Sequence, residues 1–202
     1  YDGRKMLAGI AILERRGQDV MDRPTGLLAE RAADADAAHL RAQGRLLLRH
    51  WPEALAEHDA LIARSPEREE YHLGRAQALL GLDRAPEALA VTTAFVHRAQ
   101  GEDQSVSLNT ELALAQALNQ ADRPKEALAI EDRILGLIPD DANLIRERAG
   151  TLAYLDRHAD AVVELDRAAG LSETLLPSDY VQRGASLRWT QGRDAARAEY
   201  EK

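Results

Sequence analysis

The chain has 202 residues, of which 45% are apolar and only 4% aromatic, and its formal net charge is −8 at pH 7. The absence of Cys excludes disulfides, thiolate metal sites and cysteine nucleophiles. The acidic balance argues against nucleic-acid binding, which requires a clustered basic surface. Ala and Leu outweigh aromatic residues, so the composition favours an all-α fold.

The first 35 residues are predicted to form a degenerate N-terminal helical pair. The apolar run from Met6 to Leu13 is too short to span a bilayer, so we expect a buried helix near 3–16. The segment DRPTG at 22–26 interrupts the pattern, and a second helix is expected near 25–34. We interpret residues 1–35 as a cap for the repeats that follow.

From residue 36 onward the sequence repeats with a period close to 34 residues. Two columns of small residues mark the repeat, and each member of the second column lies 12 residues after its counterpart in the first. The first column is Ala42, Ala76, Ala115, Ala149 and Gly184, and the second is Ala54, Ala88, Ala127, Ala161 and Ala196. One small residue on each helix lets two helices pack closely, and the Leu that follows most first-column residues three positions later is expected to fill the layer.

Each repeat is predicted to be a pair of helices joined by a short turn. The expected units are 36–68, 69–107, 108–141, 142–176 and a truncated 177–202. In the clearest unit we expect helices at 141–155 and 159–171. Pro124 suits the start of a second helix, and Pro66 and Pro139 are expected to end their units.

This pattern resembles the tetratricopeptide repeat (TPR), a 34-residue helix–turn–helix with small residues and aromatics at fixed positions. The final unit matches it best, at Tyr180, Gly184, Leu187, Ala196 and Tyr200. The second-helix aromatic is replaced in three units, by His58, Thr92 and Glu131. The resemblance implies a right-handed α-α superhelix, a TPR solenoid of about five to six helix pairs, and the array is expected to continue beyond Lys202.

In such a solenoid the first helices line a concave groove, and offsets from the first small column identify the candidate groove residues. They are Gln43, Gln77, Gln116, Asn119, Gln120, Asn143, Arg146, Tyr154, Arg188 and Trp189. Amides both donate and accept hydrogen bonds, which suits a peptide backbone or sugar hydroxyls, and an aromatic ring beside Arg suits a side chain, a sugar face or an acidic group. The alternatives are that the glutamines are solvated polar positions and that Trp189 packs against a following repeat.

No pattern in the sequence indicates catalysis, a metal or a cofactor. The six His residues lack ligand spacing, and there is no phosphate-binding glycine loop or nucleophile-elbow Ser. The carboxylates at second-helix positions, Glu131, Asp132, Glu164 and Asp166, are expected to face solvent. The chain is therefore predicted not to be an enzyme.

The resemblance leaves three functional hypotheses open. The first is a scaffold whose groove binds a protein or peptide partner and helps to assemble a complex. The second is a periplasmic TPR domain of a bacterial exopolysaccharide export protein that contacts polysaccharide. The third is a spacer or self-association module. Localisation stays open, with the absence of Cys slightly favouring the bacterial periplasm over the cytoplasm.

Overall fold

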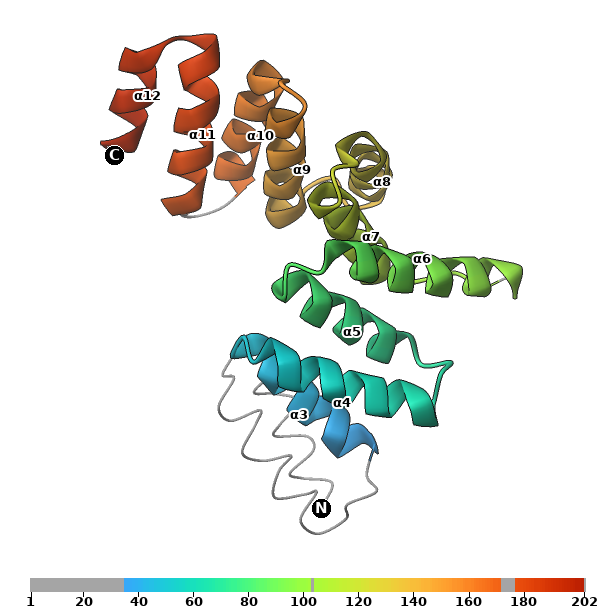
Figure 1. The fold of residues 1–202 in the computed structure, drawn as a ribbon. Helices are drawn as coiled ribbons and strands as arrows, with labels where there is room; N and C mark the ends of the chain where they lie inside the picture. The colour runs from blue at the N-terminus through green and yellow to red at the C-terminus, as the bar shows by residue number, and fades with distance from the viewer. Residues whose placement is uncertain (1–34, 103, 172–176, 202) are drawn as a thin grey trace. The chain divides into compact units, whose positions relative to one another are not determined.

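The structure, a computed structural model, describes residues 35–102, 104–171 and 177–201. Ten α-helices and no strand lie within these ranges (Figure 1). The helices are α3 Ala35–Leu47, α4 Trp51–Arg64, α5 Glu69–Gly81, α6 Ala85–Gly101, α7 Leu108–Gln120, α8 Pro124–Leu137, α9 Ala142–Tyr154, α10 His158–Leu171, α11 Pro177–Thr190 and α12 Arg193–Tyr200. The predicted all-α fold is confirmed for this part of the chain. The helices predicted near 3–16 and 25–34 lie outside it.

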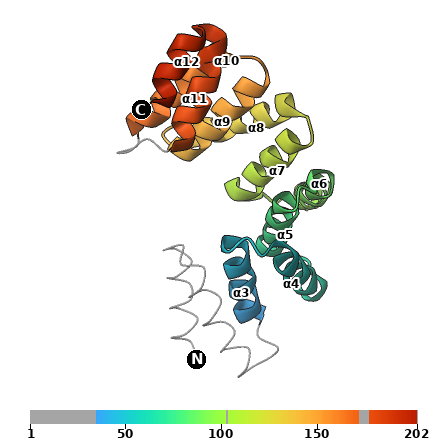
Figure 2. The same ribbon diagram turned by 60° about the vertical axis from the view of Figure 1, so that its left-hand side comes forward.

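The helices form two compact units that divide between Ala121 and Asp122. The N-terminal unit contains α3 to α7, and the C-terminal unit contains α8 to α12. In the N-terminal unit α3, α5 and α7 pack side by side as a row of first helices, with α4 and α6 beside that row (Figure 2). In the C-terminal unit α9 packs against α8 and α10, and α11 packs against α10 and α12.

The two columns of small residues lie at helix contacts, as predicted. All ten members are buried, and most of the alanines have no exposed surface at all. The leucines three residues after the small residue of the first helix are also buried: Leu79, Leu118, Leu152 and Leu187. Small residues let the helix backbones approach, and the leucines then fill the layer between them.

The turns after α3, α5, α7 and α9 share one backbone conformation. The residue seven positions after the small residue has a positive φ at Arg49 (60°), Asp83 (57°), Asp122 (61°) and Asp156 (59°). Asp enters this left-handed region more readily than most residues because its short side chain can bond locally. In three turns the next residue is an Arg that forms an ion pair with an acid three positions later, in Arg84–Glu87, Arg123–Glu126 and Arg157–Asp160.

In the first four units the position where the TPR pattern has its second-helix aromatic is buried, even where the residue is polar. His58, Thr92 and Glu131 are all buried. The His58 ring nitrogen Nδ1 lies 2.8 Å from the Ala54 carbonyl oxygen, and the Thr92 hydroxyl donates to the carbonyl of Ala88 at 2.6 Å. His58 and Thr92 therefore reach partners on their own helices, which offsets the cost of removing them from water.

Candidate functional site

A hollow in the N-terminal unit brings three of the predicted groove residues together. It has a volume of about 360 Å³ and draws its lining from α3, α4, α5 and α7. The lining residues are Gln43, Leu46, Leu47, Trp51, Gln77, Leu80 and Gln116. The three glutamines come from three adjacent first helices, as equivalent positions in successive repeats should. We call this feature the amide hollow.

The amide hollow has an apolar lining that the sequence analysis did not include among the site residues. Leu46 and Leu80 are buried, whereas Leu47 is exposed. The ring of Trp51 lies directly against Gly81, since a Cβ built on that glycine would be 2.4 Å from the ring atom Cδ2. The missing side chain at Gly81 thus lets the indole pack closely against α5. In the sequence, this contact is indicated by a Trp at the first position of α4 and a Gly at the last position of α5.

The three glutamines of the amide hollow differ in whether they already interact with other groups of the protein. Gln43 is half-buried and Gln77 is exposed. Neither side chain has a hydrogen-bond partner within the ranges that the structure describes, whereas Gln116 already interacts within the protein. Among the residues that the structure describes, no charged side chain lines the hollow. It therefore combines two available amides with an uncharged apolar surface, which suits an extended backbone carrying apolar side chains.

Two predicted groove residues near the end of α7 do not line the amide hollow. Asn119 is half-buried and interacts within the protein. Gln120, the last residue of α7, is exposed. Their amides lie farther along the helix than Gln116, so a ligand in the hollow would have to extend along α7 to reach them.

In the C-terminal unit, Arg146 is held by an ion pair with Asp179. The Arg146 Nε lies 2.9 Å from both carboxylate oxygens of Asp179, and the two side chains are only 12% and 5% exposed. Arg146 Nη1 also donates to the Asn143 side-chain oxygen at 3.4 Å. The structure thus brings the predicted residues Asn143 and Arg146 together on α9, and the pair of Arg146 with Asp179 links α9 to α11.

Tyr154, Arg188 and Trp189 do not share one hollow. The Tyr154 ring is 63% exposed, and its hydroxyl donates to the Asp122 carboxylate at 2.9 Å, which raises the pKa of Tyr154. Trp189 is 74% exposed and stacks on His158, with ring centroids 5.6 Å apart and an interplanar angle of 6°. Arg188 lines a different hollow, between α11 and α12. The three residues occupy equal or adjacent offsets from the small residues of two successive repeats, but their side chains have different partners.

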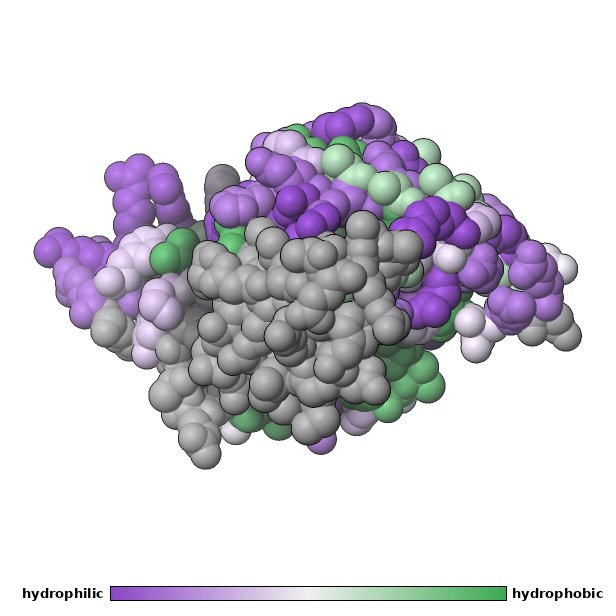
Figure 3. Space-filling model, turned by 90° about the horizontal axis from the view of Figure 1, so that it is seen from below, coloured by the Kyte–Doolittle hydropathy of each residue, from purple (hydrophilic) through white to green (hydrophobic). Residues whose placement is uncertain are grey.

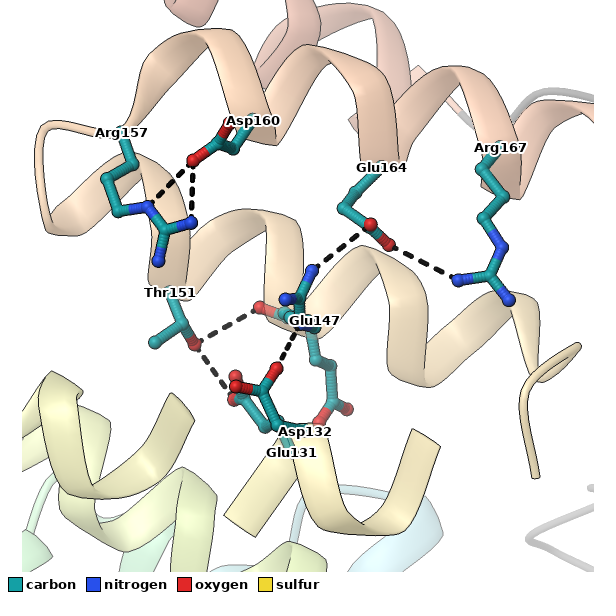
Figure 4. A network of polar contacts seen from close by, with 9 residues as sticks. Glu131, Asp132, Glu147, Thr151, Arg157, Asp160, Glu164 and Arg167 are labelled. Atoms are coloured by element: carbon teal, nitrogen blue, oxygen red, sulfur yellow. Dashed lines mark hydrogen bonds and ion pairs between the residues drawn. The ribbon is translucent and has the colours of Figure 1, made fainter. Parts of the chain in front are cut away.

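The expectation that Glu131 faces solvent is wrong. Only 1% of Glu131 is exposed, and its Oε1 accepts a hydrogen bond of 2.8 Å from the Thr151 hydroxyl on α9 (Figure 4). The physical reason is its position: Glu131 occupies the aromatic site of the TPR pattern, which packs against the following helix. Burial without donors would be costly for a carboxylate, and Thr151 supplies one.

Glu164 is also less solvated than expected, whereas Asp132 and Asp166 are exposed as predicted. Arg148 joins two of these acids: its Nε lies 2.7 Å from Asp132, and its Nη1 lies 3.1 Å from Glu164 (Figure 4). The carboxylates of α8 and α10 are thus linked through one guanidinium on α9. Such a network orients side chains between neighbouring helices, in addition to keeping the surface polar.

The described residues contain no group of three or more His, Asp or Glu side chains that could hold a metal ion. Among the described helices, none combines the length and apolar character needed to cross a membrane. On the face shown in Figure 3, hydrophilic residues cover most of the described surface, and hydrophobic residues lie in smaller areas between them.

Comparison of the structure with solved proteins identifies the fold class. A tetratricopeptide repeat protein from Parabacteroides merdae ATCC 43184 aligns with a TM-score of 0.75 at 18% identity, over 98% of this chain and 75% of its own. PilW, a widely conserved type IV pilus biogenesis factor, aligns with a TM-score of 0.80 at 17% identity, over 98% and 91% of the two chains. YrrB, a TPR protein with an unusual peptide-binding site, gives 0.60 at 15% identity, over 87% and 88%.

At the level of sequence, no family model and no curated protein matches the chain. The structural similarity, together with the helix pairs and the two buried small columns, shows that the chain has the tetratricopeptide-repeat fold. At these low identities the similarity defines the fold and does not assign a partner. The predicted TPR fold is confirmed for the described residues.

Proposed function

We propose that this chain is a non-enzymatic binding module that holds an extended protein or peptide segment in the amide hollow of its N-terminal unit. The observation that carries the proposal is the meeting of Gln43, Gln77 and Gln116 around an uncharged hollow lined by leucines and Trp51. The two available amides would bond the peptide backbone, and the apolar lining would receive its side chains. The peptide-binding site of YrrB, which has the same fold, supports a peptide as the ligand class.

The chemistry of the amide hollow favours a particular kind of segment. The described lining carries no charge, so a segment with charged side chains at these contacts would lose hydration without gaining an ion pair there. An extended segment with spaced Leu, Ile or Met residues would instead bury apolar surface against Trp51 and Leu47. The module would therefore select by backbone shape and apolar spacing.

The test is a peptide selection with a built-in reporter. Peptides selected from a displayed random library on the intact chain are titrated against a Trp189→Phe form, in which Trp51 is the remaining tryptophan and lies in the hollow. A Gln43→Ala/Gln77→Ala variant is expected to weaken binding by about 30-fold, from two lost hydrogen bonds of about 1 kcal/mol each. A matched control removes an exposed amide from the other unit, by Gln182→Ala.

Circular dichroism and melting temperature should be unchanged in both variants, because the altered amides are not buried. If the selected peptides bind the Gln43→Ala/Gln77→Ala variant as tightly as the unaltered chain, or leave Trp51 fluorescence unchanged, the amide hollow is not the binding site.

A second candidate function, carbohydrate binding, is favoured by one observation. Trp189 is largely exposed, and one face of its ring stacks on His158. It lines a hollow together with Asp156 and Asp160. A flat aromatic face beside carboxylates can stack on a sugar ring and accept its hydroxyls. Such a site would accord with a role in polysaccharide export in the bacterial envelope. A TPR fold also occurs in PilW, a type IV pilus biogenesis factor.

This alternative is tested by titrating neutral and acidic oligosaccharides against a Trp51→Phe form and following the fluorescence of Trp189. A saturable change that Asp160→Asn abolishes would place carbohydrate binding ahead of peptide binding. An unchanged spectrum at millimolar sugar would remove the carbohydrate candidate.

A further inference from the structure

The hollow between α11 and α12 carries a concentration of positive charge in an otherwise acidic chain. Its volume is about 360 Å³, and its lining residues are Arg188, Arg193, Ala196, Arg197 and Tyr200. We call this surface the arginine face. Three of its five described lining residues are arginines, whereas the whole chain has a net charge of −8. It lies in the C-terminal unit and shares no residue with the amide hollow.

Two of the three arginines have no partner within residues 177–201 or elsewhere in the described chain. Arg188 and Arg193 are exposed and form no ion pair or hydrogen bond there. Arg197 is different, because its Nε lies 2.7 Å from the Glu201 carboxylate. Most other arginines of the C-terminal unit form ion pairs, as Arg146, Arg148 and Arg183 do. The arginine face therefore presents unpaired positive charge.

The repeat register explains why this face is unusual. Arg193 and Arg197 lie 9 and 13 residues after Gly184. The residues 13 positions after the small residue in the first three units are all leucines: Leu55, Leu89 and Leu128. These leucines belong to or pack against hydrophobic clusters that also contain a residue of the next first helix. The residue 13 positions after Gly184 is Arg197, so α12 carries a guanidinium group where these three units have a stacking leucine.

A partner on this face must therefore supply negative charge. A helix or segment approaching α12 as α5 approaches α4 would meet Arg193 and Arg197 and would have to pair them with carboxylates. Guanidinium and carboxylate groups match in geometry and can form two parallel hydrogen bonds. Tyr200, half-exposed at the same hollow, adds an aromatic ring on which an apolar side chain can pack.

We propose that the arginine face is a docking surface for an acidic polypeptide segment. Its Asp or Glu carboxylates pair with Arg188 and Arg193 and compete with Glu201 for Arg197, while an apolar side chain packs on Tyr200. A polypeptide fits better than a nucleic acid, because nucleic-acid affinity rests on many phosphate contacts and α12 also carries Asp194. This surface is independent of the amide hollow and would give the chain a second, chemically different partner site.

The experiment uses the full chain and a short fluorescein-labelled peptide of alternating Glu and Leu, followed by fluorescence anisotropy. The matched peptide has Gln in place of every Glu. The test variant is Arg188→Gln/Arg193→Gln, and the control variant, Arg49→Gln/Lys125→Gln, removes the same two charges from exposed positions elsewhere. All of these side chains are exposed, so each variant should keep the melting temperature of the unaltered chain.

We expect the acidic peptide to bind the chain, the Gln peptide to bind at least about tenfold more weakly, and the Arg188→Gln/Arg193→Gln variant to lose a similar factor. The control variant should stay within about twofold. Absence of binding to the unaltered chain, or equal losses in the two variants, would overturn the proposal.

Two further outcomes would overturn the polypeptide assignment while keeping the basic surface. Single-stranded DNA or a sulfated polysaccharide that displaces the peptide and binds more tightly would identify a polyanion as the ligand. Self-association in light scattering that disappears in the Arg188→Gln/Arg193→Gln variant would identify the occupant as a second copy of this chain. Neither competitor binding nor self-association is expected if the proposal holds.

Discussion

Acidification should destabilise the N-terminal unit through a single buried imidazole, that of His58. Its ring is completely buried, and Nδ1 is bonded to the Ala54 carbonyl, so Nδ1 carries the proton and Nε2 carries the lone pair. Nε2 has no hydrogen-bond partner among the described residues and faces Gly74, where a Cβ would lie 2.0 Å away. A second proton would therefore place a charge in a closed, apolar space.

The size of the effect follows from the pKa. The pKa of His58 is lowered from 6.5 to about 4, mainly by burial and in smaller part by the neighbouring His39, whose ring centroid lies 5.8 Å away, while the hydrogen bond to Ala54 opposes the shift. Between these two values the unfolded chain binds a proton that the folded chain does not, so stability falls as the pH falls from 6.5 towards 4. The free energy of unfolding should drop by about 2 kcal/mol between about pH 7 and pH 5.

A neighbouring imidazole, that of His39, also makes the folded chain less stable as the pH falls. Burial also lowers the pKa of His39, although the carboxylates of Glu70 and Asp36 oppose that shift and the guanidinium of Arg68 reinforces it. His39 therefore adds to the loss of stability at low pH. The contribution of His58 itself has to be isolated by substitution.

The assay is urea unfolding of a Trp189→Phe form at pH 7 and pH 5, with Trp51 fluorescence reporting on the N-terminal unit. His58→Leu supplies an apolar residue of the kind that Leu165 provides at the equivalent position of α10, and it removes the titrating group. The stability difference between the two pH values should shrink by about 2 kcal/mol in this variant. If His58→Leu keeps the full pH dependence, the assignment of that dependence to the buried imidazole is incorrect.

Two further predictions concern packing and buried polar groups. Gly74→Ala should lower the free energy of unfolding by about 1–3 kcal/mol, because the new methyl group meets the fully buried ring of His58. Gly184→Ala should lower it less, because the Tyr200 ring that the methyl group meets is half-exposed and can rotate away. Thermal unfolding of the two variants compares these losses. Thr151→Val should destabilise the C-terminal unit by about 1–3 kcal/mol, since it removes a hydrogen-bond donor from the buried carboxylate of Glu131. Urea unfolding of the variant measures this loss, and a stability equal to that of the unaltered chain would contradict this account.

Residue size and spacing predicted the packing of the repeats well. The columns of Ala and Gly and the leucines three residues later are buried because a helix contact depends on volume at a fixed position, and volume can be inferred from the residue type. The helices predicted at 141–155 and 159–171 correspond to α9 and α10 to within a residue at each end. Asp141 proves to be the cap of α9, with its carboxylate accepting from the backbone N–H groups of Asn143 and Leu144.

Side-chain partners were harder to predict than helix positions. The solvent-facing assignment of Glu131 followed from its charge, although its register already placed it at the buried aromatic position. Offsets from the small column located the backbones of Tyr154 and Trp189, but they do not identify the partners of their side chains. These are Asp122, in the turn after α7, and His158, at the start of α10. The pairing of Arg146 with Asp179 likewise joins residues 33 positions apart and had no local signal.

The polar residues at the aromatic position make the helix pairs of this chain unlike one another. A helix that follows α8 must offer a hydroxyl at the place of Thr151, and a helix that follows α4 must leave the space of Gly74 for an imidazole. The Leu, Ala, Glu and Gln at the positions equivalent to Gly74 in the other first helices would not leave the space that the His58 ring needs. The pair that contains α4 is therefore matched to α5 as its neighbour.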